Sequence, residues 1–102
     1  FVGNYLKEKG IEFTPQYSFK DCRDKNPLPF DFMIMINGQM KLIEFDGSQH
    51  FVKRGIYYSE TALRHDELKN TYCKEHNILL LRIPYGWLRN NRARNELDKF
   101  TQ

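Results

Sequence analysis

The stretch that decides the fold of this chain runs from residue 30 to residue 50 and reads FDFMIMINGQMKLIEFDGSQH. Phe30–Ile36 is apolar apart from Asp31, and the Asn37-Gly38 dipeptide that follows is the strongest short signal for a two-residue β-turn. Residues 40–46 then form a second segment rich in apolar side chains. The pattern predicts two antiparallel strands joined by a tight turn.

Acidic residues interrupt both predicted strands. Glu44 and Asp46 are two residues apart, so in a strand their side chains point to the same face. If the Asn37-Gly38 turn sets the register, Asp31 lies at the same end of the hairpin, whereas a slip of one residue would reverse the faces. Charge in a core-like strand is costly and favours a metal or catalytic role. The alternative is that Asp46-Gly47 is only a turn and that Glu44 faces solvent on a half-buried sheet.

Three carboxylates at one place repel one another, and a divalent cation relieves that repulsion. Hard oxygen ligands without a thiolate favour Mg²⁺ or Mn²⁺ over zinc. A zinc site built from Cys22, Cys73 and His76 is the competing metal hypothesis, but these residues are poorly spaced for it. We therefore expect both cysteines to be buried structural residues.

Composition limits the class of protein. A chain of 102 residues with 40% hydrophobic residues suits one domain with a single core. No apolar run is long enough to cross a membrane, there is no signal-peptide pattern, and two cysteines are too few for a disulfide framework. A cytoplasmic location is therefore expected, without a membrane partner.

The charge distribution favours a polyanionic partner. The formal net charge is +3, and four arginines fall in the last quarter of the chain, at positions 82, 89, 92 and 94. Lys53 and Arg54 follow the acidic cluster. Phosphate contacts need such cations. The alternative for the arginines at 89–94 is a solvated helix face.

The remaining segments complete an α-β-β-β-α-β-α order. The pattern predicts an opening helix that ends at Lys9-Gly10, an edge strand within 11–19, a polar loop over 21–29, an irregular connection over 51–59, a helix over 61–76, a central buried strand over 78–83 and a short amphipathic helix over 95–100. We expect a mixed α/β fold in which a small mixed sheet is covered by helices on both faces.

The segments at 28–32, 42–50, 65–69 and 80–83 resemble, in order and spacing, the PD-(D/E)XK nuclease superfamily. They read Leu-Pro-Phe-Asp-Phe, Leu-Ile-Glu-Phe-Asp-Gly-Ser-Gln-His, His-Asp-Glu-Leu-Lys and Leu-Leu-Arg-Ile. Within the superfamily the chain is similar to the very-short-patch-repair endonuclease branch and to the related phage homing endonucleases with an EDxHD signature. The resemblance implies a restriction-endonuclease-like fold.

The resemblance also implies roles for individual residues. Asp31 corresponds to the metal-binding aspartate, and Glu44-Phe45-Asp46 occupies the place of the (D/E)XK tripeptide, so that Asp31, Glu44 and the Phe45 carbonyl oxygen would hold the ion. His50 corresponds to the histidine that activates water, and Asp66 to the acid that pairs with it. Asp46 stands where the tripeptide has lysine; either Lys69 supplies that charge or His50 takes over its role.

Plainer alternatives remain for three of these residues. His50 could be a surface loop histidine, and Asp66 could compensate the helix dipole near the start of its helix. Lys69 could be a solvated helix lysine.

The activity implied by the resemblance is that of a metal-dependent endonuclease acting on double-stranded DNA. The 102 residues would be the catalytic domain of a longer protein that carries a further DNA-binding region, and a homodimer is compatible with this arrangement. The first glutamate of the EDxHD signature would precede Phe1. Two alternatives are a nucleic-acid-binding module on a decayed nuclease fold and a structural partner in a larger restriction complex.

Overall fold

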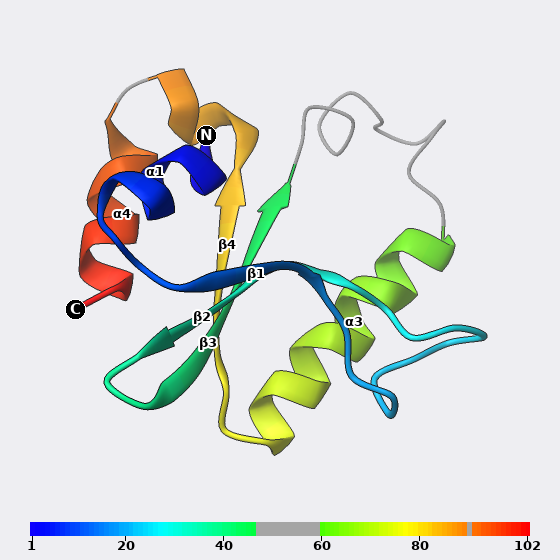
Figure 1. The fold of residues 1–102 in the computed structure, drawn as a ribbon. Coiled ribbons are helices and arrows are strands. Elements are labelled where there is room, and N and C mark those ends of the chain that lie inside the picture. The colour runs from blue at the N-terminus through cyan, green and yellow to red at the C-terminus, as the bar shows by residue number, and fades with distance from the viewer. Residues whose placement is uncertain (47–59, 90) are drawn as a thin grey trace.

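The computed structural model describes residues 1–46, 60–89 and 91–102 (Figure 1). Its elements follow the predicted order: α1 (Val2–Glu8), β1 (Phe13–Tyr17), β2 (Phe30–Ile36), β3 (Gln39–Asp46), α3 (Glu60–Glu75), β4 (Leu79–Pro84), the 3-10 helix η1 (Tyr85–Arg89) and α4 (Arg92–Phe100). The last helix begins earlier than predicted because Ala93, one turn before the buried Leu97, also packs into the core.

The four strands form one mixed sheet in the order β1-β2-β3-β4. The β1/β2 and β2/β3 pairs are antiparallel, and the β3/β4 pair is parallel. The predicted edge position of β1 is confirmed, but the prediction that residues 78–83 form a central strand is wrong, because β4 is at the edge of the sheet in the described part of the chain. Its apolar run reflects a parallel strand reached by a helical crossover rather than two flanking strands.

The hairpin turn has the geometry that its sequence predicts. Asn37 and Gly38 have φ angles of 51° and 79°, both in the left-handed region required at the two central positions of a type I′ turn. The turn pairs Ile36 with Gln39 and thereby sets Phe32 opposite Ile43. The predicted register is confirmed, and with it the position of the acidic end of the hairpin.

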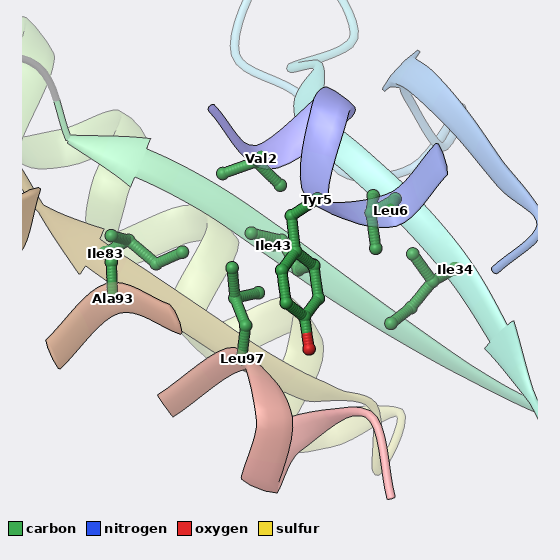
Figure 2. Close-up of a cluster of buried hydrophobic side chains, with 8 residues drawn as sticks. All are labelled: Val2, Tyr5, Leu6, Ile34, Ile43, Ile83, Ala93 and Leu97. Atoms are coloured by element: carbon green, nitrogen blue, oxygen red, sulfur yellow. The ribbon is translucent and has the colours of Figure 1, made fainter. Parts of the chain in front are cut away.

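Two hydrophobic clusters cover opposite faces of the sheet. Figure 2 shows the first cluster, in which α1 and α4 pack over one face through Val2, Tyr5, Leu6, Ile34, Ile43, Ile83, Ala93 and Leu97. The second cluster joins α3 to the other face and contains Cys22, Phe30, Leu42 and Cys73. Figure 1 accordingly places α1 and α4 together on one side of the strands and α3 on the other. The predicted covering of both faces is confirmed.

Both cysteines are buried free thiols in the second cluster, as predicted. His76, the third residue of the zinc hypothesis, is exposed and stacks on the ring of Tyr72 at a centroid distance of 4.0 Å. Within the described residues no group of three His, Cys, Asp or Glu side chains is arranged to hold a metal ion. None of the helices in these ranges is long and apolar enough to cross a lipid bilayer.

The strand alternation of β2 breaks at Asp31. Phe30 packs in the α3-side cluster, whereas Phe32, two residues later, packs against the opposite cluster. On the paired strand, Gln16 lies between the partners of these two residues and has a φ angle of 52°. The change of face between Phe30 and Phe32 therefore occurs at Asp31.

Candidate active site

The acidic end of the hairpin is held together by carboxylates instead of a regular strand ladder. Continuing the Phe32–Ile43 register by one residue places Asp31 opposite Glu44. The Asp31 backbone N–H donates a 2.8 Å hydrogen bond to Glu44 Oε2, and the Phe45 backbone N–H donates a 2.6 Å hydrogen bond to Asp31 Oδ2. Each carboxylate thus satisfies the main chain of the opposite strand, and the predicted meeting of Asp31 with Glu44 is observed.

Helix α3 brings Lys69 to the same place. Lys69 Nζ donates a 2.8 Å hydrogen bond to Glu44 Oε1, and the two side chains retain only 12% and 9% of their exposure. The ammonium group also lies 5.2 Å from the centroid of the Phe30 ring, which adds a cation–π contact. The alternatives in which Glu44 and Lys69 were solvated residues are therefore wrong.

The electrostatics of Glu44 are dominated by its burial, which raises the pKa of this carboxyl above the usual value. The hydrogen bond and charge of Lys69 oppose that shift, while the nearby negative charge of Asp31 adds to it. The net direction is upward because loss of water costs the carboxylate more than one cation returns. Any further cation that enters here would favour the ionised form.

The donor atoms around Asp31 suit a hard cation. In a strand, the N–H and the C=O of one residue point to the same neighbouring strand. Because the Phe45 N–H points to Asp31, the Phe45 carbonyl oxygen points to that side of β3 as well. A carboxylate and a carbonyl, completed by water and substrate phosphate, are the kind of ligand set that Mg²⁺ uses. Glu44, the third predicted ligand, already has both oxygens in hydrogen bonds.

Two predicted site residues cannot be placed. His50 lies outside the described residues. The Asp46 backbone pairs with Pro84 at the end of β3, but its side chain also lies outside what the structure describes. The predicted meeting of three carboxylates is therefore observed for two of them.

Asp66 is paired with a residue that the sequence did not assign to it. Its Oδ1 lies 3.5 Å from Nη1 of Arg82, and its backbone carbonyl accepts a 3.4 Å hydrogen bond from Nη2 of the same arginine. The predicted pairing of Asp66 with His50 stays a prediction.

Arg82 is the site residue that sequence reasoning undervalued. It is next to Glu44 in the parallel register of β3 and β4, and its Nε and Nη2 donate hydrogen bonds of 3.1 and 3.0 Å to Asn70 Oδ1. The sequence carries a signal for Arg82, because it is the only charged residue within the apolar run of β4. A charge in an apolar strand is also the feature that singled out Glu44. Arg82 and Lys69 make the α3 side of the site cationic beside the acids of the hairpin.

Comparisons of the chain with protein-family models, with curated proteins and with solved structures found no match. The geometry of Asp31, Glu44, Phe45 and Lys69 is therefore the basis on which a function is proposed.

Proposed function

We propose that this chain is the catalytic domain of a metal-dependent DNA endonuclease with a restriction-endonuclease-like fold. The observation that carries the proposal is the reciprocal bonding of Asp31 and Glu44 across the end of the hairpin, with Lys69 on Glu44. A buried acid and a buried lysine next to a second acid form an unusual and costly arrangement, and such arrangements concentrate at catalytic sites. The α-β-β-β-α-β-α order and the mixed sheet support the same proposal.

Each residue has a separable role in this proposal. Asp31 and the Phe45 carbonyl oxygen would bind Mg²⁺ or Mn²⁺, which supplies charge stabilisation of the phosphate and acidifies bound water. Glu44 fixes the Asp31 backbone and adds negative charge beside the ion. Lys69 favours the ionised form of Glu44 and holds its side chain in place, and in that position it provides the positive charge that the tripeptide lacks at Asp46.

The proton acceptor in the proposal is His50. A histidine accepts a proton near neutral pH, where its ordinary pKa lies, and it follows the end of β3 by only a few residues. Asp66 would steady the imidazolium while it remains paired with Arg82, because a carboxylate has two oxygens and several lone pairs. The substrate in this proposal is double-stranded DNA, and the four arginines from position 82 onward, together with Lys53 and Arg54, support a phosphate-rich partner.

Conversion of supercoiled plasmid to the nicked and linear forms in Mg²⁺ tests the proposal. Asp31→Asn keeps an oxygen that accepts the Phe45 N–H but removes the charge, so we expect cutting to be lost with the fold intact. Asp31→Ala should also abolish cutting, but it removes the acceptor of the Phe45 N–H and should lower stability as well. Glu67→Gln, which changes an exposed acid of α3, should cut normally. Equal cutting by Asp31→Asn and the parent chain would refute the proposal.

One observation favours a second candidate, a nucleic-acid-binding module without catalysis. Both Glu44 oxygens are already bonded, and the described residues include no ready group of three metal-ligating side chains of the His, Cys, Asp and Glu types. In that case the Lys69–Glu44 pair is purely structural. The chain would then retain duplex DNA in a gel-shift assay with Mg²⁺ and yet leave plasmid uncut, whereas the nuclease does both.

A further inference from the structure

A hollow of about 350 Å³ lies between the loop after β1 and the first half of α3. Its walls are Asp24, Lys25, Asn26, Pro27 and Leu28 from the loop and Arg64 and His65 from the helix. Figure 1 shows this loop running beside α3, on the side of the molecule away from α1 and α4. None of the residues that line the hollow takes part in the hydrogen bonds of the candidate active site.

Positive charge predominates in this hollow, because its lining contains two cations, Lys25 and Arg64, and one acid, Asp24. Arg64 Nη2 and His65 Nε2 each lie 3.1 Å from the same oxygen, Asp24 Oδ2. These two contacts lower the pKa of Asp24, so it is a carboxylate at neutral pH. Arg64 and Lys25 are nevertheless exposed, and the Arg64 side chain keeps 61% of its accessibility. A single anchored acid therefore orients an arginine and a histidine without removing them from solvent.

Two elements, α3 and the chain that leads into β2, carry residues of both the hollow and the candidate active site. His65 precedes Lys69 by one helical turn, so both side chains lie on the same face of α3. Leu28, which is buried, lies just before the start of β2 and its Asp31. Helix α3 and the chain before β2 therefore connect the hollow to the residues of the candidate active site.

We infer that this hollow is a phosphate-binding subsite, formed by Lys25, Arg64 and His65, that holds the backbone of a nucleic acid strand on its way to Asp31. The inference rests on the proposed function and adds a second place where the substrate backbone is bound, at a distance from the phosphodiester bond that is cut. Arg64 binds a phosphodiester through its planar fork, Lys25 adds a mobile point charge, and Asp24 keeps Arg64 and His65 pointing into the hollow. No base is read here, so the subsite contributes affinity without sequence preference.

The test is the salt dependence of duplex DNA binding, measured by fluorescence anisotropy in Ca²⁺. Lys25→Gln/Arg64→Gln should weaken binding and reduce the slope of log K against log salt by about 2, roughly one for each phosphate that these two cations neutralise in the parent chain. The matched control, Lys7→Gln/Lys74→Gln, removes two exposed lysines from α1 and from the far end of α3. Its slope should change far less. Plasmid cutting by the double variant should lose activity at low DNA concentration and recover it at saturating DNA.

Asp24→Asn separates a binding role from a structural one. It removes the negative charge but keeps both cations and an amide oxygen that can still accept hydrogen bonds from Arg64 and His65, so we expect DNA binding at least as tight as that of the parent chain. If Asp24→Asn weakened binding as much as the double variant does, the loss would come from disordered side chains and the subsite would be wrong.

The remaining outcomes separate the subsite from the proposed function. An unchanged slope in Lys25→Gln/Arg64→Gln, with the parent chain still cutting plasmid, would overturn the subsite alone. A parent chain that neither binds nor cuts DNA would overturn the proposed function with it. Competition by inorganic phosphate against DNA, with no added effect of duplex length, would indicate a site for the free anion and overturn the strand-binding role.

Discussion

Lys69 on α3 donates a 2.8 Å hydrogen bond to Oε1 of Glu44 on β3, and both side chains are almost completely buried. The other oxygen of Glu44 receives the Asp31 N–H, so one carboxylate ties the helix to the hairpin and the hairpin strands to each other. Charges are rarely buried in this way, because desolvation costs several kcal/mol for each ion and only a well-placed partner and further hydrogen bonds offset that cost. The pair therefore has consequences for stability as well as for the proposed chemistry.

Removing only one member of the Lys69–Glu44 pair should lower the free energy of unfolding substantially. Lys69→Met leaves the Glu44 carboxylate buried without its cation, and we expect a loss of roughly 3–5 kcal/mol in the free energy of unfolding. Urea denaturation of Lys69→Met, Glu44→Leu and the double variant would measure the coupling. The double variant should recover the part of the loss that comes from the unpaired charge, because an apolar pair avoids the desolvation cost. The Asp31 N–H, which loses its acceptor when Glu44 is replaced by leucine, should account for the remaining loss. Additive losses in the double variant would contradict a specific Lys69–Glu44 interaction.

The raised pKa of Glu44 makes stability depend on pH. An unfolded glutamate has a pKa of about 4.3, and between that value and the higher pKa of folded Glu44 the folded chain binds more protons than the unfolded chain. The contribution of Glu44 is therefore fully present below the unfolded pKa and is lost as the pH rises through the folded pKa.

Urea unfolding in EDTA, across about pH 4 to pH 8, tests this dependence. The stability of the parent chain relative to Glu44→Gln should fall as the pH rises through this range. Two parallel curves would show that Glu44 titrates alike in the folded and unfolded chains. EDTA is needed because a bound cation would hold the carboxylate ionised and mask the effect.

A metal ion that binds near Asp31 should stabilise the fold independently of any cutting. At a Mg²⁺ concentration one hundred times its dissociation constant, we expect a gain of about 2.7 kcal/mol, seen as a rise in the thermal midpoint. Asp31→Asn should abolish the rise. Asp98→Asn on α4, which removes the charge of the group that accepts the hydrogen bond of the Tyr5 hydroxyl on α1, should lower the midpoint but keep the response to Mg²⁺. A rise of equal size in Asp31→Asn would assign the ion to another site.

Lys41 is a second buried cation, and its role is structural. It lies on β3, its Nζ donates a 2.7 Å hydrogen bond to the Phe100 carbonyl oxygen at the end of α4, and it lies 5.2 Å from the centroid of the Phe100 ring. A cation at a helix C-terminus satisfies exposed carbonyls and the helix dipole.

Lys41→Met should therefore lower the free energy of unfolding by about 1–3 kcal/mol, because the Phe100 carbonyl oxygen at the end of α4 loses the ammonium group that donates to it. Chemical denaturation would measure this, with the exposed Lys7→Met as the control that should change little. DNA cutting at a temperature well below unfolding should persist in Lys41→Met. Loss of cutting in the folded variant would place Lys41 in the active site instead.

The sequence by itself determined the hairpin and the order of the elements. Asn37-Gly38 sets both central turn residues in the left-handed region, and that local preference fixes the register that brings Asp31 opposite Glu44. The opening helix likewise ends at Glu8, just before Lys9 and Gly10, and Gly10 has a φ angle of 69° in the left-handed region. These features follow from backbone preferences of single residues or dipeptides, so the chain needs no distant contact to specify them.

Only the tertiary structure decided which charges pair and where β4 lies. Lys69 and Asp66 are on the same helix, and the sequence left a plain alternative open for each, a solvated lysine and an acid that compensates the helix dipole. In the structure Lys69 contacts Glu44 and Asp66 contacts Arg82, because of the way α3 packs against β3 and β4. The position of β4 at the sheet edge was equally hidden, since an apolar strand covered by helices on both faces has the same composition at an edge as at the centre. Pairings of this kind depend on how whole elements pack over long sequence separations, and a one-dimensional pattern carries no information on that packing.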